Sequence, residues 1–290
     1  MKLKKDVIDV GALEEYLNDA SDFDFELRVL RMLAGKGILC EHGGQYQDPD
    51  TKKFREFDIR ARITRGRVTC HAAIECKSIG RHFPLLVSCV PRSAAEATHQ
   101  VFIHQAEKRT EPVGRFGLPE IPIFENLDGT TMPLSQLYPE GEPVGKSTAQ
   151  VGRRESKDAE LVANDAEFFE KWSQALQSLD ELIYEIADRD IVHRIWDGKL
   201  HFATALPIVV VPDGTLWTVN YALDGSREAP PAQADRVSIY IDRSYGNGVP
   251  NYSFAVSHLE VMTETGLGKF CDEVFASEET IEVFTATQRN

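Results

Sequence analysis

Residues Arg55–Ser78 read REFDIRARITRGRVTCHAAIECKS, and this stretch decides the fold. In its two halves, 54–63 and 67–77, apolar and polar residues alternate with the period of a strand that is buried on one face. Arg65-Gly66 lies between the halves and predicts a tight turn. We therefore expect an antiparallel hairpin with one apolar face that packs on helices and one charged face.

The charged face of this hairpin suggests chemistry. A two-residue loop pairs residues whose numbers sum to 131, so Asp58 is expected opposite Ala73, with Glu75 and Lys77 following on the same face at backbone distances of about 7–8 Å or less. Two carboxylates this close repel each other unless a cation lies between them, which favours Mg²⁺ or Mn²⁺ with oxygen ligands. A metal beside an oriented water hydrolyses phosphodiesters. The alternative is a surface salt bridge of Lys77 with Glu75 and Asp58.

The hairpin is part of a longer series of predicted elements. Apolar residues at helical spacing predict helices, and alternating or continuous apolar runs predict strands. The expected helices are 11–20, 23–36, 93–108, 166–187 and 265–276. The expected strands are 37–46, 54–63, 67–77, 84–92, 204–212, 215–223, 236–242 and 251–262. The strand at 204–212 is apolar on both faces, which predicts a central strand that is covered on both sides.

This order of elements predicts an α/β (α+β) fold with a mixed central sheet flanked by helices. Between 109 and 163 six prolines and frequent glycines predict a loop-rich excursion. Residues 1–108 offer few strands with which to close a sheet. We therefore expect a single composite domain over 1–290, in which the helix and strands of 164–290 complete the sheet as a C-terminal strand-rich extension.

Composition and charge narrow the class of protein. The chain has no apolar run of the ~20 residues that span a bilayer and no secretory signal at its start, so we expect no membrane association. Its five cysteines are odd in number and scattered, which favours a reducing compartment, the cytoplasm. The net charge of −14 argues against broad contact with nucleic acid.

The charge is unevenly distributed, however. Residues 52–92 contain ten Lys or Arg and three acids, a net charge of +7 that leaves −21 for the rest of the chain. A basic segment in an acidic chain is typical of a local polyanion contact. The alternative is a sheet edge protected by charge. The residues expected to contact nucleic acid are Arg60, Arg62, Arg81, His82 and Arg92.

Asp58, followed after a hairpin by Glu75-Cys76-Lys77, resembles the motif of the PD-(D/E)xK phosphodiesterases, the restriction-endonuclease-like nucleases. Many members of that superfamily carry a Glu on the first core helix, and Glu26 in FDFELRVLRMLAGKGILCE is similarly placed. The order of elements over 23–108 is also similar to the family core. One departure is Phe57, which stands where the motif has Pro.

The resemblance implies a restriction-endonuclease-like core within residues 1–108. By it, Asp58, Glu75, the backbone carbonyl of Cys76 and Glu26 would hold Mg²⁺ or Mn²⁺, and Lys77 would orient the attacking water. It implies a metal-dependent nuclease with DNA rather than RNA as the preferred substrate, in a prokaryotic restriction or phage-defence system, with a homodimer or partner subunit. The alternatives are an RNA or nucleotide phosphodiesterase, and a non-enzymatic assembly subunit that keeps the nuclease fold.

Overall fold

The computed structural model describes residues 6–19, 21–48, 51–66, 68–105, 128–133, 136–154, 160–164, 166–188, 200–245 and 254–275. The helices of this part of the chain are α1 (Val10–Asp19), α2 (Phe23–Gly35), α3 (Ala166–Asp188) and α4 (Glu264–Phe275). Its strands are β1 (Leu39–Gln47), β2 (Phe54–Arg65), β3 (Val68–Cys76), β4 (Leu85–Pro91), β5 (Thr98–Gln105), β6 (Asp128–Pro133), β7 (Pro143–Arg153), β8 (Leu161–Asn164), β9 (Leu200–Val211), β10 (Leu216–Asn220), β11 (Ala232–Gln233), β12 (Arg236–Tyr245) and β13 (Phe254–Thr263). None of the described helices is long and apolar enough to cross a membrane.

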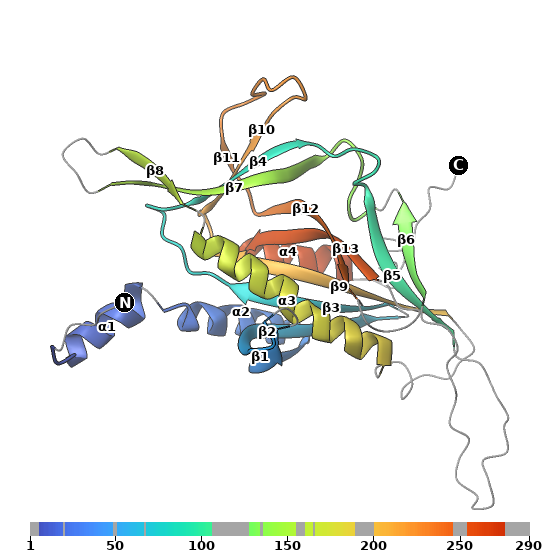
Figure 1. The fold of residues 1–290 in the computed structure, drawn as a ribbon, viewed down its shortest axis with the longest axis horizontal. Helices are drawn as coiled ribbons and strands as arrows, with labels where there is room; N and C mark the ends of the chain where they lie inside the picture. The colour runs from blue at the N-terminus through green and yellow to red at the C-terminus, as the bar shows by residue number, and fades with distance from the viewer. Residues whose placement is uncertain are drawn as a thin grey trace, which may run out of the picture.

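The strands form one large mixed sheet in the order β1-β2-β3-β9-β13-β12-β7-β4-β10-β11 (Figure 1). β1, β2 and β3 make an antiparallel meander, and β9 lies parallel to β3 over the whole length of β3. The C-terminal end of β9 also pairs in parallel with β13. This arrangement confirms the predicted central, doubly covered strand, because the apolar run of 204–212 falls in β9.

Helices cover both faces of these central strands. α2 and α4 pack on one face, where Phe25, Leu33 and Phe270 share a hydrophobic cluster with residues of β2 and β3. α3 crosses the opposite face, where Leu179 and Ile183 pack with alanines of β3 and β9 (Figure 1). The expected α/β layout, a mixed sheet flanked by helices, is confirmed.

The β2–β3 hairpin has the predicted faces but not the predicted register. Arg60, not Asp58, lies opposite Ala73, and Arg65 lies opposite Val68. The loop therefore begins at Gly66, whose φ of 55° is the left-handed conformation that glycine adopts most easily. In this register Asp58 and Glu75 stand on directly opposed positions, closer than the diagonal placement that the sequence predicted.

Two segments differ from the predicted secondary structure. The expected helix at 93–108 is instead a turn followed by β5, which pairs with both β6 and β9. Glu96 accepts the Ser93 N–H at 3.0 Å, as in the capping box at the start of a helix, but here this bond closes the turn. Within the expected excursion, the described residues form β6, β7 and β8, and β7 pairs along β4. Residues 106–127 lie outside the described part of the chain.

α4 begins with a close backbone contact. The Thr265 N–H and hydroxyl both donate to Asp213, at 3.0 and 2.7 Å, and so cap the first turn. A Cβ on Gly266 would lie 1.8 Å from the carbonyl oxygen of Asp235, whereas a Cβ on Gly268 would have its nearest neighbour at 3.8 Å. Only the first of these two glycines is required by packing.

Candidate active site

The candidate site lies at the C-terminal end of β3, where the N-terminal ends of α2 and α3 converge. α3 is capped by Asn164, whose side-chain oxygen accepts the Ala166 N–H at 3.1 Å. β2 and β3 bring one carboxylate each, from Asp58 and Glu75. The hairpin and the two helices thus direct charged side chains toward one place.

Asp58 and Glu75 share a cation that the sequence did not indicate. The Nζ of Lys171, on α3, lies 2.7 Å from Asp58 Oδ2 and 3.5 Å from Glu75 Oε2. The same Asp58 oxygen accepts the backbone N–H of Cys76 at 2.8 Å. Spacing along the hairpin cannot reveal Lys171, because this residue lies on α3, far from the hairpin in the sequence.

Glu75 is the most deeply buried group of the site. Its side chain is 0% exposed, and its Oε1 has no hydrogen-bond partner. Burial, and secondarily the negative charge of Asp58, raise the pKa of Glu75 well above its usual value. An unpaired carboxylate oxygen in the interior is unusual, because a buried acceptor without a partner is costly.

Glu26 lies behind this pair, as predicted. Its Oε2 is 3.3 Å from Nε2 of His42 on β1. Burial and the charge of Asp58 raise the pKa of Glu26. The side chain of Cys76 points into the core on the α2 face, and its backbone N–H donates to Asp58. The role of its carbonyl as a metal ligand stays a prediction.

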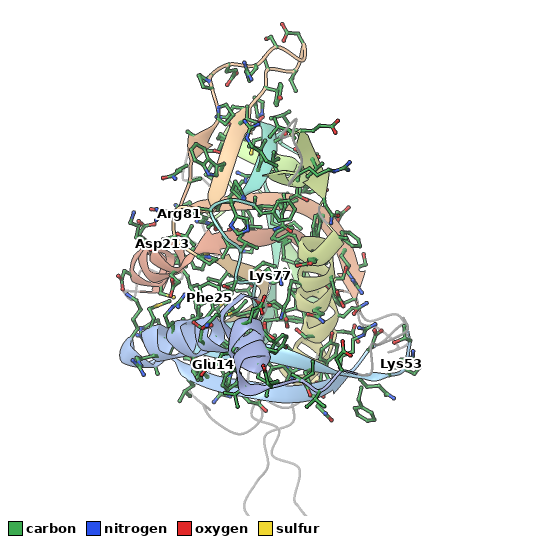
Figure 2. All side chains as sticks on the ribbon, turned by 90° about the vertical axis from the view of Figure 1, so that its left-hand side faces the viewer. Glu14, Phe25, Lys53, Lys77, Arg81 and Asp213 are labelled. Atoms are coloured by element: carbon green, nitrogen blue, oxygen red, sulfur yellow. The ribbon has the colours of Figure 1, made fainter. Side chains whose placement is uncertain are left out.

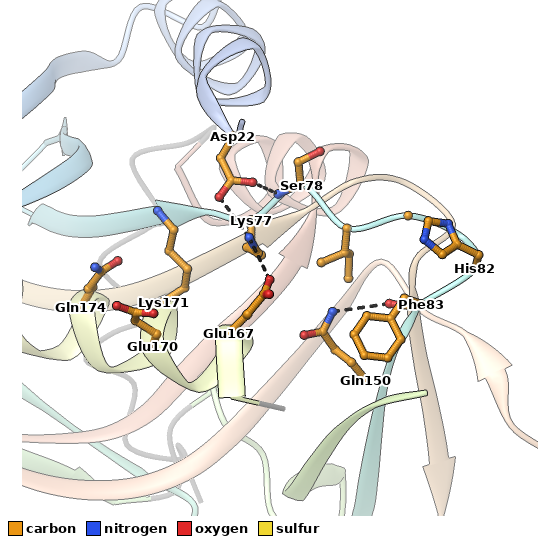
Figure 3. A pocket seen from close by; sticks show the side chains of 12 residues that line it. Asp22, Lys77, Ser78, His82, Phe83, Gln150, Glu167, Glu170, Lys171 and Gln174 are labelled. Atoms are coloured by element: carbon orange, nitrogen blue, oxygen red, sulfur yellow. Dashed lines mark hydrogen bonds and ion pairs between the residues drawn. The ribbon is translucent and has the colours of Figure 1, made fainter. Parts of the chain in front are cut away.

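Lys77 does not join Asp58 and Glu75 as expected. Its Nζ pairs instead with Asp22, at the start of α2, and with Glu167, on α3, both at 3.3 Å. Figure 2 shows Lys77 between α2 and α3, and Figure 3 shows both contacts. The physical reason is that residue 77 lies just past the end of β3, where the chain leaves the sheet and the strand alternation no longer directs its side chain.

A cavity of about 600 Å³ opens beside these side chains (Figure 3). This is the usual size of a small-molecule or nucleotide pocket. Its walls come from the start of α2, the segment after β3, β7 and the first turns of α3, and its charged lining is Asp22, Lys77, Glu167, Glu170 and Lys171. Lys171 both lines the cavity and contacts the buried carboxylates.

Two of the predicted nucleic-acid contacts are structural. Arg60 is 8% exposed and donates to Glu181 at 2.7 Å and to the Ser178 carbonyl at 3.3 Å, beneath α3. Arg92 is 4% exposed and donates to the Pro139 carbonyl at 2.8 Å. Both expectations of a free phosphate contact are wrong, because other parts of the chain cover both side chains and accept their hydrogen bonds.

The other three predicted contacts lie nearer the surface. Arg62 is half-buried and lines a separate cavity of about 260 Å³ between β1, β2 and α3. His82 is exposed and lines the cavity of the candidate site. Arg81 is exposed but lies beside Gly214, away from Lys77 (Figure 2). The structure therefore brings His82 to the site and places Arg62 and Arg81 elsewhere.

The oxygen atoms of Asp58, Glu75 and the Cys76 carbonyl are of the kind that binds a hard cation. Among the described residues there is no cluster of three or more His, Cys, Asp or Glu side chains arranged to hold a metal. Two carboxylates do converge, however, one of them with an unpaired oxygen, and the cation that they share is a flexible lysine. Asp58 and Glu75 with the Cys76 carbonyl match the oxygen ligands that Mg²⁺ and Mn²⁺ take.

Comparisons of the chain with protein-family models, with curated proteins and with solved structures found no match. The chemistry of the site therefore rests on its own residues and their contacts.

Proposed function

We propose that this protein is a metal-dependent nuclease that hydrolyses phosphodiester bonds. The observation that carries the proposal is the meeting of Asp58 and Glu75 at the end of β3, with a buried Glu75 oxygen that has no hydrogen-bond partner. Carboxylates in this setting repel each other and attract a cation. The polar cavity next to them has room for a nucleotide unit.

The arrangement of the elements supports the same proposal. α2, β1, β2 and β3 follow one another as do the first four elements of the order on which the resemblance to the PD-(D/E)xK superfamily rests, with Asp58 and Glu75 on the paired strands and Lys77 just past the end of β3. The helix expected at 93–108, which closed that order, is a turn and β5 instead. Helices flank the mixed sheet on both faces. We infer a restriction-endonuclease-like core from this combination.

In this proposal Asp58, Glu75 and the backbone carbonyl of Cys76 would hold Mg²⁺ or Mn²⁺, and Glu26 would support Asp58 from α2. When bound, the metal would supply positive charge for the phosphate and activate a water. Hydrolysis adds one water across the P–O ester bond and leaves a phosphate monoester and a hydroxyl group. Lys77 lines the cavity, where its ammonium would orient the water and stabilise the charge that develops on phosphorus-bound oxygens.

The proposed substrate rests on the resemblance to the nuclease superfamily. We propose DNA as the preferred polyanion, on the resemblance, within a prokaryotic restriction or phage-defence system. His82 at the cavity and Arg62 and Arg81 at the surface remain as candidate backbone contacts. Because the whole chain has a net charge of −14, a second copy or a partner subunit would supply the remaining contacts to the DNA backbone.

One observation favours the alternative of a non-enzymatic assembly subunit. Lys171 already pairs with Asp58 and Glu75 without a metal, and Lys77 is paired with two other acids. A purely structural cluster would also hold its acids in ion pairs of this kind. The two functions differ in whether a divalent ion binds and whether cleavage follows.

The test is cleavage of plasmid DNA, linear single-stranded DNA and RNA in Mg²⁺, in Mn²⁺ and in EDTA. We expect metal-dependent cleavage by the unmodified protein and by Glu14→Gln on the exposed α1, and none by Glu75→Gln. Mn²⁺ should also raise the melting temperature of the first two, since a ligand at a hundred times its Kd adds about 2.7 kcal/mol. Cleavage that survives in Glu75→Gln would overturn the nuclease proposal. No cleavage together with no metal-dependent shift would favour the assembly subunit.

A further inference from the structure

Lys171 takes the central place in the site. Its side chain is 17% exposed, and its Nζ lies between the carboxylates of Asp58 and Glu75 at 2.7 and 3.5 Å. Lys77, the other lysine of the cavity wall, contacts Asp22 and Glu167 instead. The ammonium of Lys171 is therefore the counter-ion of the pair of acids.

The neighbouring charges make this counter-ion necessary. Asp58 and Glu75 face it from β2 and β3, and Glu26, 14% exposed, approaches Asp58 from α2. His42 on β1 contacts Glu26 at 3.3 Å. Without the ammonium, three carboxylates would share one poorly hydrated place, and mutual repulsion at short range and low dielectric is strong.

Lys171 also belongs to the cavity wall. Figure 3 shows its side chain extending from α3 alongside Glu170 and Gln174. A lysine carries its charge on a four-carbon stem with several rotatable bonds, so the ammonium can reach a new partner without movement of the helix. The same side chain can thus serve the buried carboxylates or the cavity.

We propose that Lys171 holds the place of the metal in the metal-free protein and turns into the cavity to bind the scissile phosphate when a divalent cation enters. This inference rests on the proposed function. An ammonium and a divalent cation cannot both lie against the same carboxylate oxygens, because they repel each other. A phosphate in the cavity would replace the carboxylates as the partner of the displaced ammonium.

Calorimetric titration with MnCl₂ in the absence of substrate tests this competition. Lys171→Met should bind Mn²⁺ at least tenfold more tightly than the unmodified protein, because no ammonium has to be displaced. Lys77→Met, whose lysine lines the same cavity but pairs with other acids, should change the affinity less than threefold. Lys171→Arg keeps a cation at the carboxylates and should not bind Mn²⁺ more tightly.

Cleavage measured on the same variants separates the two proposals. We expect Lys171→Met to lose cleavage at saturating Mn²⁺ even though it binds the metal more tightly. An unchanged or weaker Mn²⁺ affinity in Lys171→Met would overturn the role of Lys171, and the nuclease proposal would stand if the unmodified protein cleaves. Tighter Mn²⁺ binding by Lys171→Met, without any cleavage by the unmodified protein, would overturn the nuclease proposal and leave the displacement of Lys171 by the metal supported.

If Lys171→Met fails to fold in EDTA, its melting temperature in Mn²⁺ decides the question. A rise larger than that of the unmodified protein would support the competition between Lys171 and the metal, and no rise would overturn it.

Discussion

Asp58→Asn and Glu75→Gln alter the same cluster, but only Asp58→Asn should lower the stability of the metal-free protein. Asp58 makes the short contacts, to the Cys76 N–H at 2.8 Å and to Lys171 at 2.7 Å. Glu75 is fully buried, lies 3.5 Å from the same Nζ and has one oxygen without a partner. The two acids therefore contribute unequally to the folded state.

The magnitudes follow from these contacts. Hydrogen bonds to charged groups contribute about 1.5–3 kcal/mol each, and removal of one partner of a buried ion pair costs about 3–5 kcal/mol. We expect Asp58→Asn to lower the free energy of unfolding at pH 7 by about 3 kcal/mol. For a chain of this size the melting temperature should fall by roughly 6–12 °C.

Glu75→Gln removes a desolvated charge that Asp58 repels. Each pKa unit by which the folded protein raises Glu75 corresponds to about 1.4 kcal/mol of destabilisation at neutral pH. The new amide N–H groups offset part of the gain, since an unpaired buried donor costs about 1–3 kcal/mol. We expect the free energy of unfolding to stay equal or to rise, by at most about 2 kcal/mol.

Thermal and urea unfolding at pH 7 in EDTA measure both effects. Glu170→Gln is the matched control, because Glu170 is an exposed acid on the cavity wall and should change stability by less than about 0.5 kcal/mol. Equal destabilisation by Asp58→Asn and Glu75→Gln would refute the reasoning. An Asp58→Asn variant with an unchanged free energy of unfolding would also refute it, because the short contacts of Asp58 would then contribute nothing to stability.

Three further predictions concern pH, a buried arginine and a crowded glycine. The pKa of Glu75 is raised in the folded protein above its ordinary 4.5, so above pH 4.5 the folded protein binds more protons at this residue than the unfolded chain does. The melting temperature should therefore fall as the pH rises from 4.5 through the raised pKa. Glu75→Gln should make this fall smaller. Arg60→Ala should lower the free energy of unfolding, measured in urea, by about 2–3 kcal/mol, because packing and two hydrogen bonds are lost. Arg81→Ala, at an exposed position, should lower it by less than about 0.5 kcal/mol. An Arg60→Ala variant as stable as the unmodified protein would contradict the structural role of Arg60. Gly266→Ala should destabilise by about 1–3 kcal/mol, whereas Gly268→Ala on the same helix should stabilise by about 0.5–1 kcal/mol, so a gain in melting temperature at both positions would contradict the close contact at the start of α4.

The sequence by itself determined the elements around the site and the faces of its strands. Alternation along a strand is a local property, so Ile59, Cys70 and Ile74 could be assigned to one buried face before any partner was known, and they do share a core cluster. Helical periodicity located α2, α3 and α4 in the same way. The positions of Glu26, Asp58 and Glu75 followed from these local patterns.

The tertiary structure alone decided which elements and charges meet. Residues 98–105 carry adjacent buried side chains, Val101 and Phe102, that suit a helix or a strand, and the free edges of β6 and β9 made the segment a strand. Lys171 lies 96 residues from Glu75 along the chain, so its place between the carboxylates depends on how α3 crosses the sheet. The same crossing buries Arg60. Long-range packing selects the partner of a charge, and no local period in the sequence records that choice.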